Sequence, residues 1–394
     1  MRFFIKNMTT NKYRVDAEAT EINPDSLNRT GMIPRLRELA IHGLERMYLP
    51  EKKLFVFRTR RAMDGIISEG FSRRYTAIAL IGLAGEEKKL LESVLAGHNL
   101  QMVCERLKEE AGHVDNPGDA ALILWAACAT GYPDRREIRK RLLDLLSVDK
   151  AHPVVEVSWA LDALCMNRES RDSDLIRGLA QRLSSSFNER SSVFPHVLGE
   201  NNNGPRSHVS CFADMVYPIH ALASYFKFSG DRIALDIATR CAEKICELQG
   251  PEGQWWWHYD LRTGNVIEPY PVYSVHQDAM APMALFALHE AGGPDFYREI
   301  QKGLDWLAYS PEIRTSLIDE KADLIWRKVA RREPGKLSRY TQAIASRLHP
   351  SLRMPGMDIM FPPGLIDYEN RPYHLGWILY AWPKERFKTW NSLA

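Results

Sequence analysis

The sequence has little that marks a secreted, membrane-spanning or nucleic-acid-binding protein. Its six cysteines include no pair with CxxC spacing and lie mostly within apolar helical patterns, which predicts reduced thiols. The N-terminus has no apolar run long enough for a signal peptide or a membrane span. The formal net charge is only +2, so charge gives no argument for binding nucleic acid. These absences predict a cytoplasmic protein.

A flexible linker is also missing. At 394 residues the chain is long enough for two domains, but no Ser-rich or Gly-rich stretch divides it. We therefore predict one domain over residues 31–394, preceded by a polar, flexible segment at residues 1–30. The hydrophobic content of 45% is ordinary for a globular protein and is sufficient for a large core.

Several apolar segments begin with a charged residue and are followed by a turn and a more charged, amphipathic segment. Asp278 and Asp214 each stand four residues before a proline and precede an apolar run. Glu156 and Asp119 begin similar runs, and Arg74 begins another with the opposite charge. A helix that is apolar all round is buried, whereas a helix with a single apolar stripe covers it. Irregular repeats of such hairpins predict a ring of buried and covering helices.

The predicted fold class is therefore all-α, an α/α toroid of about six helical hairpins. The expected inner helices begin near residues 74, 118, 154, 212, 277 and 373. In such a ring the inner helices run parallel, so that their N-terminal ends surround one mouth of a central cavity. The charged residues expected to meet there are Arg74, Asp119, Glu156, Asp214, His276, Asp278 and His374.

The most informative stretch connects two predicted hairpins, from Gln249 to Leu288. It carries three adjacent tryptophans, Trp255 to Trp257, which cannot all face one core. His276 and Asp278 then stand where the next apolar helix begins, and Asp278 could simply cap that helix. A second long loop, residues 187–209, is rich in Asn and Gly and leads directly into Asp214. We predict that it closes over the mouth.

Residues 310–353 interrupt the repeat and are the most basic part of the chain. We expect two basic amphipathic helices, at residues 322–332 and 336–347, in a helical insertion. A solvated face explains these charges most simply. Peripheral contact with an anionic membrane through residues 322–353, or binding of a phosphorylated substrate, are the alternatives.

One short motif gives a family resemblance. Gln249-Gly-Pro-Glu-Gly253-Gln-Trp255 matches the Q-x(3)-G-x-W core of the QW motif. It resembles the motif of squalene–hopene cyclase-like terpenoid cyclases and, more loosely, of protein prenyltransferase β subunits. The resemblance implies an α/α toroid with a structural Gln and Trp. The chain departs from these families because it has no DxDD, the proton-donating motif of the cyclases, and no DDxxD.

The same resemblance suggests zinc ligands, because protein prenyltransferases hold zinc with Asp, Cys and His. Cys211, Asp214 and His374 are the matching residue types, but the Asp-x-Cys spacing is missing. We therefore expect neither a metal nor another cofactor.

Three functions remain open. The first is acid-initiated cyclisation or isomerisation of an isoprenoid, with Asp278 as proton donor positioned by His276 and an aromatic wall that stabilises carbocations. The second is carbohydrate chemistry with the carboxylates of Glu156, Asp214 and Asp278. The third is a non-catalytic toroid that binds a lipid or a protein. We rank the cyclase first because of the QW motif. The expected substrate-binding residues are Arg74, Trp159, Tyr217, Trp255, Trp256, Trp257, Tyr273, His374 and Trp377.

Overall fold

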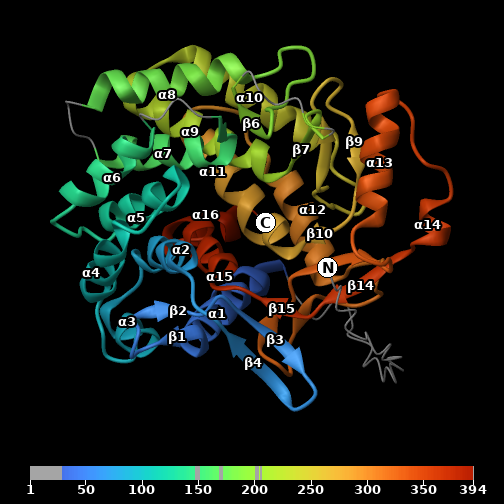
Figure 1. The fold of residues 1–394 in the computed structure, drawn as a ribbon. Helices are drawn as coiled ribbons and strands as arrows, with labels where there is room; N and C mark the ends of the chain where they lie inside the picture. The colour runs from blue at the N-terminus through green and yellow to red at the C-terminus, as the bar shows by residue number, and fades with distance from the viewer. Residues whose placement is uncertain (1–28, 147–150, 168–171, 200–203, 205, 394) are drawn as a thin grey trace, which may run out of the picture.

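The computed structural model describes residues 29–146, 151–167, 172–199, 204 and 206–393 (Figure 1). The flexible segment predicted at residues 1–30 lies almost wholly outside these residues, and the first helix already begins at Arg29. Among the described helices, none is long and apolar enough to cross a membrane.

The apolar helices form a closed ring, as the repeats predict. Each packs against the next, and the last returns to the first. Within the described residues, the ring consists of α2 (Arg73–Leu83), α5 (Pro117–Ala129), α7 (Val154–Asn167), α9 (Ala213–Ser229), α11 (Ala281–Glu290) with the preceding π-helical turn η3 (His276–Met280), and α15 (Pro372–Ala381). The predicted toroid and all of its predicted inner helices are confirmed.

Amphipathic helices pack against this ring or against one another. They are α1 (Arg29–Met47), α3 (Lys88–Val94), α4 (Leu100–Ala111), α6 (Arg136–Leu146), α8 (Ser173–Ser186), α10 (Arg232–Glu247), α12 (Tyr297–Ala308) and α16 (Lys384–Leu393). Most of them surround the ring in Figure 1, whereas α16 is seen beside α15 near the middle of the view. Helix α4 was not expected from the sequence.

Local signals explain where the inner helices begin. The hydroxyl of Ser72 accepts a hydrogen bond from the backbone N–H of Tyr75 at 3.2 Å and caps α2. Asn116 caps α5 in the same way, with Pro117 in the first turn, where a missing N–H costs nothing. These caps fix which side chains stand at the helix starts.

Two glycines close the ring. A Cβ atom on Gly82 of α2 would lie 2.1 Å from the carbonyl oxygen of Gly376 in α15. A Cβ on Gly376 would meet the backbone of α2 at 2.6 Å. The first and last inner helices therefore approach more closely than any side chain would permit.

Short strands occupy the connections between hairpins and form two- and three-stranded sheets. Three of these sheets lie beside the starts of α7, α9 and η3. They contain β5 (His152–Pro153) with β6 (Val197–Leu198); β7 (Val209–Cys211), β8 (His258–Asp260) and β9 (Val266–Glu268); and β10 (Val272–Tyr273), β13 (Lys328–Arg331) and β14 (Pro363–Asp367). The others contain β1 (Tyr48–Leu49) and β2 (Leu54–Phe55); β3 (Arg58–Ala62), β4 (Gly65–Glu69) and β15 (Glu369–Asn370); and β11 (Ile318–Asp319) and β12 (Leu324–Ile325).

The helix predicted at residues 322–332 is wrong, because this segment forms β12 and β13. Arg327 pairs with Asp367 of β14 at 3.3 Å, and Arg331, which is itself buried, donates to Glu268 of β9 at 2.8 Å. Tertiary pairing therefore overrides the helical periodicity. The second basic helix is present as α13 (Leu337–Leu348), followed by α14 (Met357–Met360), and both lie on the outside of the ring (Figure 1).

Candidate active site

The starts of α2, α5 and α7 bring one arginine and two carboxylates together. Arg74 pairs with Asp119, and its guanidinium lies 4.0 Å from the carboxylate of Glu156. The side chains of Asp119 and Glu156 remain 23% and 14% exposed, so solvent and a ligand can reach both acids. Because first-turn residues of neighbouring helices touch here, these inner helices run in the same direction, as the sequence predicts.

Glu156 is set apart from Asp119 by its surroundings. Burial raises the pKa of Glu156, the nearby Asp119 charge raises it further, and Arg74 partly offsets both. Gly118 makes the room for this side chain, because a Cβ there would lie 2.7 Å from Cγ of Glu156. Asp119 instead bonds directly to Arg74 and to the Asn116 side chain. The two neighbouring acids therefore differ in their partners, and burial favours the protonated form of Glu156.

Aromatic side chains continue from this cluster around the ring. The Arg74 guanidinium lies 5.5 Å from the ring centre of Trp159, which packs edge-on against Tyr217 at 5.0 Å. Tyr217 in turn lies 6.1 Å from Trp377. Trp159, Tyr217 and Trp377 are thus brought together as predicted, although Trp377 is fully buried and Trp159 retains only slight exposure.

Asp278 has a different environment from the one predicted. Its carboxylate bonds to His374 Nε2 at 2.8 and 2.9 Å, rather than being positioned by His276, and its side chain is fully buried. Burial raises the pKa of Asp278, and His374 lowers it. Pro282 lacks the N–H that would bond the Asp278 carbonyl, and Trp382 Nε1 donates to that oxygen at 2.7 Å instead. A catalytic role for Asp278 stays a prediction.

His276 lies among aromatic rings. It stacks on Trp257 with ring centres 5.5 Å apart and contacts Phe212 at 4.6 Å. Burial lowers the pKa of His276 to about 3, so the ring is neutral at physiological pH. Its Nδ1 has no hydrogen-bond partner among the described residues.

A cavity of about 360 Å³ adjoins the starts of α9 and η3. Its lining combines aromatic and cationic side chains, and it includes His196, Arg206, Cys211, Trp257, His258, Lys336, Arg339 and Tyr340. Arg339 Nε has no hydrogen-bond partner in the described part of the chain. The Val154 N–H donates to the His196 carbonyl at 3.0 Å, which places this cavity beside α7.

The loop predicted to close the mouth lies on the expected side of the ring. Its β6 pairs with β5 directly before α7, and β7 leads into α9. Residues 200–203 and 205, at its centre, lie outside the described residues. Closure of this loop stays a prediction.

The adjacent tryptophans have separate environments, as expected. Trp255 is fully buried against Phe212, and Trp256 packs edge-on against Tyr270. Trp257 borders the cavity and contacts Tyr273, which has Arg327 and Lys328 over its ring. Only the last of the three tryptophans is therefore placed to contact a ligand in this cavity.

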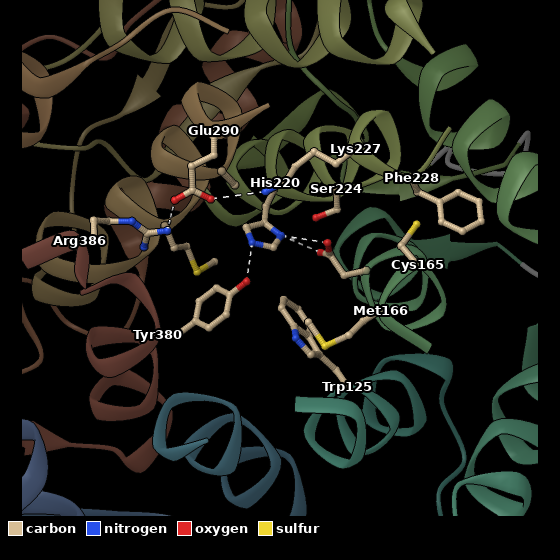
Figure 2. Close-up of a pocket in the computed structure, with 13 residues that line it drawn as sticks. Trp125, Cys165, Met166, His220, Ser224, Lys227, Phe228, Glu290, Tyr380 and Arg386 are labelled. Carbon is tan, nitrogen blue, oxygen red and sulfur yellow. Dashed lines mark hydrogen bonds and ion pairs between the residues drawn. The ribbon is translucent and has the colours of Figure 1, made fainter. Parts of the chain in front are cut away.

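The opposite end of the ring holds a second cavity, of about 250 Å³ (Figure 2). There His220 Nδ1 bonds both carboxylate oxygens of Asp162 at 3.0 Å, and its Nε2 bonds the Tyr380 hydroxyl at 2.9 Å. Glu290 accepts from Arg386 at 2.5 Å and pairs with Lys227 at 3.5 Å. The polar groups of this cavity therefore satisfy one another's hydrogen bonds. At the other end of the ring, His276 Nδ1 and Arg339 Nε have no hydrogen-bond partner among the described residues.

Sequence reasoning missed His196 and Arg206. Both lie in the loop before α9, outside the repeated pattern on which the prediction relied. The available signal was a histidine within a long loop that feeds into an inner-helix acid.

Comparison with known proteins shows the fold. No family model matches the sequence, and no curated protein matches it. Among solved structures, an unsaturated glucuronyl hydrolase specific for heparin is similar, with a TM-score of 0.58 and 12% identity over 92% of this chain and 97% of that one. An unsaturated glucuronyl hydrolase from Bacillus sp. GL1 has a TM-score of 0.56 and 12% identity, covering 89% and 94%. A sugar epimerase from a ruminal bacterium has a TM-score of 0.55 and 10% identity, covering 89% and 98%.

These neighbours contradict the predicted terpenoid cyclase or prenyltransferase family and its isoprenoid cyclase or isomerase chemistry. The QW motif gave a wrong prediction of family because its residues have a structural role: they pack one helical hairpin against the next. Gln249 Nε2 donates to the Glu299 carbonyl at the start of α12 at 2.8 Å, and Trp255 packs beside Gly303. In this chain these contacts join α10 and the following loop to α12, and they place neither Gln249 nor Trp255 at a substrate.

Proposed function

We propose that this chain is a carbohydrate-active enzyme that acts on a glycosidic bond next to a negatively charged sugar unit. The observation that carries the proposal is the partly exposed pair of Glu156 and Asp119 at the starts of two neighbouring inner helices. The fold adds support, because the proteins of similar structure are described as glucuronyl hydrolases and a sugar epimerase.

The two acids have different roles in this proposal. Glu156, with its raised pKa, holds a proton and delivers it to the leaving oxygen as a general acid. Asp119, fixed by Arg74, stabilises positive charge that develops on the sugar ring. Trp159 and Tyr217, which are 6% and 4% exposed, form the apolar wall behind this pair.

Cationic side chains favour an anionic substrate. Arg206, Lys336 and Arg339 line the neighbouring cavity, and Arg339 Nε lacks a partner among the described residues. A guanidinium binds a carboxylate or sulfate group through paired hydrogen bonds. The inner-helix N-termini at this end add a further field that favours anions.

The test is Glu156→Gln, assayed on uronic-acid-containing oligosaccharides with unsaturated and saturated non-reducing ends. We expect the variant to keep its melting temperature and to lose turnover by a factor of ~100 or more, the scale of a lost general acid. Wild-type turnover falls as pH rises through the pKa of Glu156, because the acid must be protonated. Because the pKa of Glu156 is raised, this decrease in turnover should occur at a higher pH than for an ordinary glutamate. The pH profile of Glu156→Gln should not show the decrease.

Glu243→Gln is the matched control, since Glu243 is exposed on the covering helix α10. Its turnover should equal that of the wild type. Full turnover in Glu156→Gln would place the chemistry elsewhere, with Asp214 and Asp278 the remaining predicted acids. Wild-type protein that turns over no oligosaccharide of the set would count against the proposed substrate class.

We also propose peripheral contact with an anionic membrane through α13. Leu337, Ile344 and Leu348 share one face of this helix and are 43%, 60% and 77% exposed. Lys336 and Arg347 flank them, and an apolar face bordered by cations suits the surface of an anionic bilayer. The cytoplasmic location likewise stays a prediction.

Sedimentation with phospholipid vesicles tests this contact. The wild type should sediment with vesicles containing anionic lipid and stay in solution with zwitterionic ones. Ile344→Ser with Leu348→Ser should abolish sedimentation, whereas Ile233→Ser, on α10 and 68% exposed, should not change it. Sedimentation of the double variant at the wild-type level would contradict the proposal.

A further inference from the structure

The residues His196, Cys211 and Asp214 converge at the wall of the cavity beside α9. One ligand atom from each, a nitrogen, a sulfur and an oxygen, lies within 4.8 Å of the other two. His196 Nδ1 lies 3.1 and 3.0 Å from the two carboxylate oxygens of Asp214. The cluster is thus already assembled by the fold.

Backbone contacts hold this cluster in place. The Cys211 N–H donates to Asp214 Oδ2 at 2.7 Å, which orients the carboxylate at the start of α9. Ser210 Oγ donates to the Phe194 carbonyl at 2.6 Å, and this bond ties the loop before β6 to β7. The segment carrying His196 is therefore fixed against the segment carrying Cys211. Such supporting bonds are typical of residues that bind a metal ion.

We infer that His196, Cys211 and Asp214 bind one Zn²⁺ ion. Imidazole, thiolate and carboxylate are the ligands that Zn²⁺ takes in proteins, and three protein ligands leave a fourth position open. The cavity of about 360 Å³ borders this cluster and has room for a water molecule or a ligand group at that position. The inference does not depend on the proposed function.

The set of ligands differs from the one the sequence suggested. His374 was the matching histidine, but it bonds the Asp278 carboxylate instead. His196 replaces it, and its side chain is 55% exposed while that of Asp214 is fully buried. The exposed histidine gives an ion a path to the buried carboxylate.

Charge is balanced when the ion binds. As the ion binds, the Cys211 thiol loses its proton to solvent, and the proton that His196 Nδ1 donates to Asp214 moves to Nε2 or to solvent. The ion then faces one thiolate, one carboxylate and a neutral imidazole. The net charge of the three ligands and Zn²⁺ is then zero. Arg206, Lys336 and Arg339, which line the same cavity, therefore meet a neutral centre rather than an added positive charge.

A thiol nucleophile activated by histidine is the competing explanation for the same residues. It requires the imidazole to bond the sulfur, whereas His196 Nδ1 bonds the Asp214 carboxylate. The geometry therefore favours three ligands around one ion.

The test uses the full chain, freed of metal with a chelator and titrated with Co²⁺ and then with Zn²⁺. We expect one Co²⁺ per chain with a sulfur-to-cobalt charge-transfer band, and displacement of that ion by one equivalent of Zn²⁺. Cys211→Ser should lose the band, and His196→Gln should weaken zinc binding by a factor of ~100 or more, above the cost of losing a supporting residue. Because His196 is half exposed, its replacement should leave the chain folded.

Cys246→Ser is the control, because Cys246 is a partly buried cysteine of α10 outside the cluster. It should keep the band and bind zinc as the wild type does. Zinc should also raise the melting temperature of the wild type and of Cys246→Ser, but not of Cys211→Ser. A wild type without the charge-transfer band, or a Cys211→Ser variant that keeps it, would overturn the inference.

Discussion

Glu156 and Asp278 occupy equivalent positions on two sides of the ring, and they differ in access. Each stands in the first turn of an inner helix or of the π-helical turn before it. Burial raises the pKa of both carboxyl groups. The side chain of Glu156 is 14% exposed and only loosely paired, whereas that of Asp278 is fully buried and bonded twice to His374. A raised pKa is therefore not sufficient to identify an acid that reaches a substrate.

The difference has a structural cause on each side. At α5, Gly118 has no side chain, and Glu156 extends through the space that a Cβ would occupy. At α15, His374 and Trp382 both bond Asp278, one through its carboxylate and one through its carbonyl. An acidic residue in the first helical turn thus belongs to an accessible site at Glu156 and to the packing of the ring at Asp278.

Asp278→Asn should have the largest effect on stability. Asn keeps one oxygen acceptor but loses the charge-assisted bond to a buried histidine, which should lower the free energy of unfolding by ~2–3 kcal/mol. Turnover per folded molecule should stay within ~10-fold of the wild type, in contrast to Glu156→Gln. Urea denaturation and turnover, both measured below the melting temperature of the variant, separate the two effects.

An effect of Asp278→Asn on turnover rather than on stability would reverse the roles assigned to Glu156 and Asp278. A loss of ~100-fold or more in Asp278→Asn with an unchanged melting temperature would show that Asp278 is the general acid, as the sequence alone suggests. Glu156 would then be the structural member of the two.

Asp162→Asn should have a smaller effect, and on stability alone. Asp162 bonds His220 at the far end of the ring, beside a cavity from which water can replace a lost bond. We expect a decrease of ~1 kcal/mol in the free energy of unfolding and unchanged kcat and KM. Asp236→Asn, at an exposed position of α10, is the control and should change neither. A fall in kcat for Asp162→Asn alone would move the chemistry to the cavity in Figure 2.

The helical repeat was readable from the sequence because the apolar runs are long and their starts carry polar caps. Ser72 and Asn116 cap where the pattern predicts a start, and Pro282 coincides with the junction of η3 and α11. The segment at residues 322–332 was misread because its basic, amphipathic pattern also fits strands. Only its pairing with β10 and β14, which are distant in sequence, decides between helix and strand.

The candidate site was readable in part. Arg74, Glu156 and Trp159 meet because the inner helices start at one end of the ring, a consequence of the hairpin repeat. His196 could not be placed, because its approach to Asp214 depends on how a long loop folds back. The partner of Asp278 was misassigned to His276, two residues away, since proximity along a chain does not show which side chains face each other.

The sequence by itself therefore determined the toroid, through the alternation of buried and covering helices, and the polar residue type at each helix start. It could not determine which acid is accessible, because access depends on side chains from other helices. Only the tertiary structure seals Asp278 beneath His374 and leaves Glu156 open beside Gly118. Burial and hydrogen-bond partnership are properties of the packed ring, and these two properties decide where a proton can be given to a substrate.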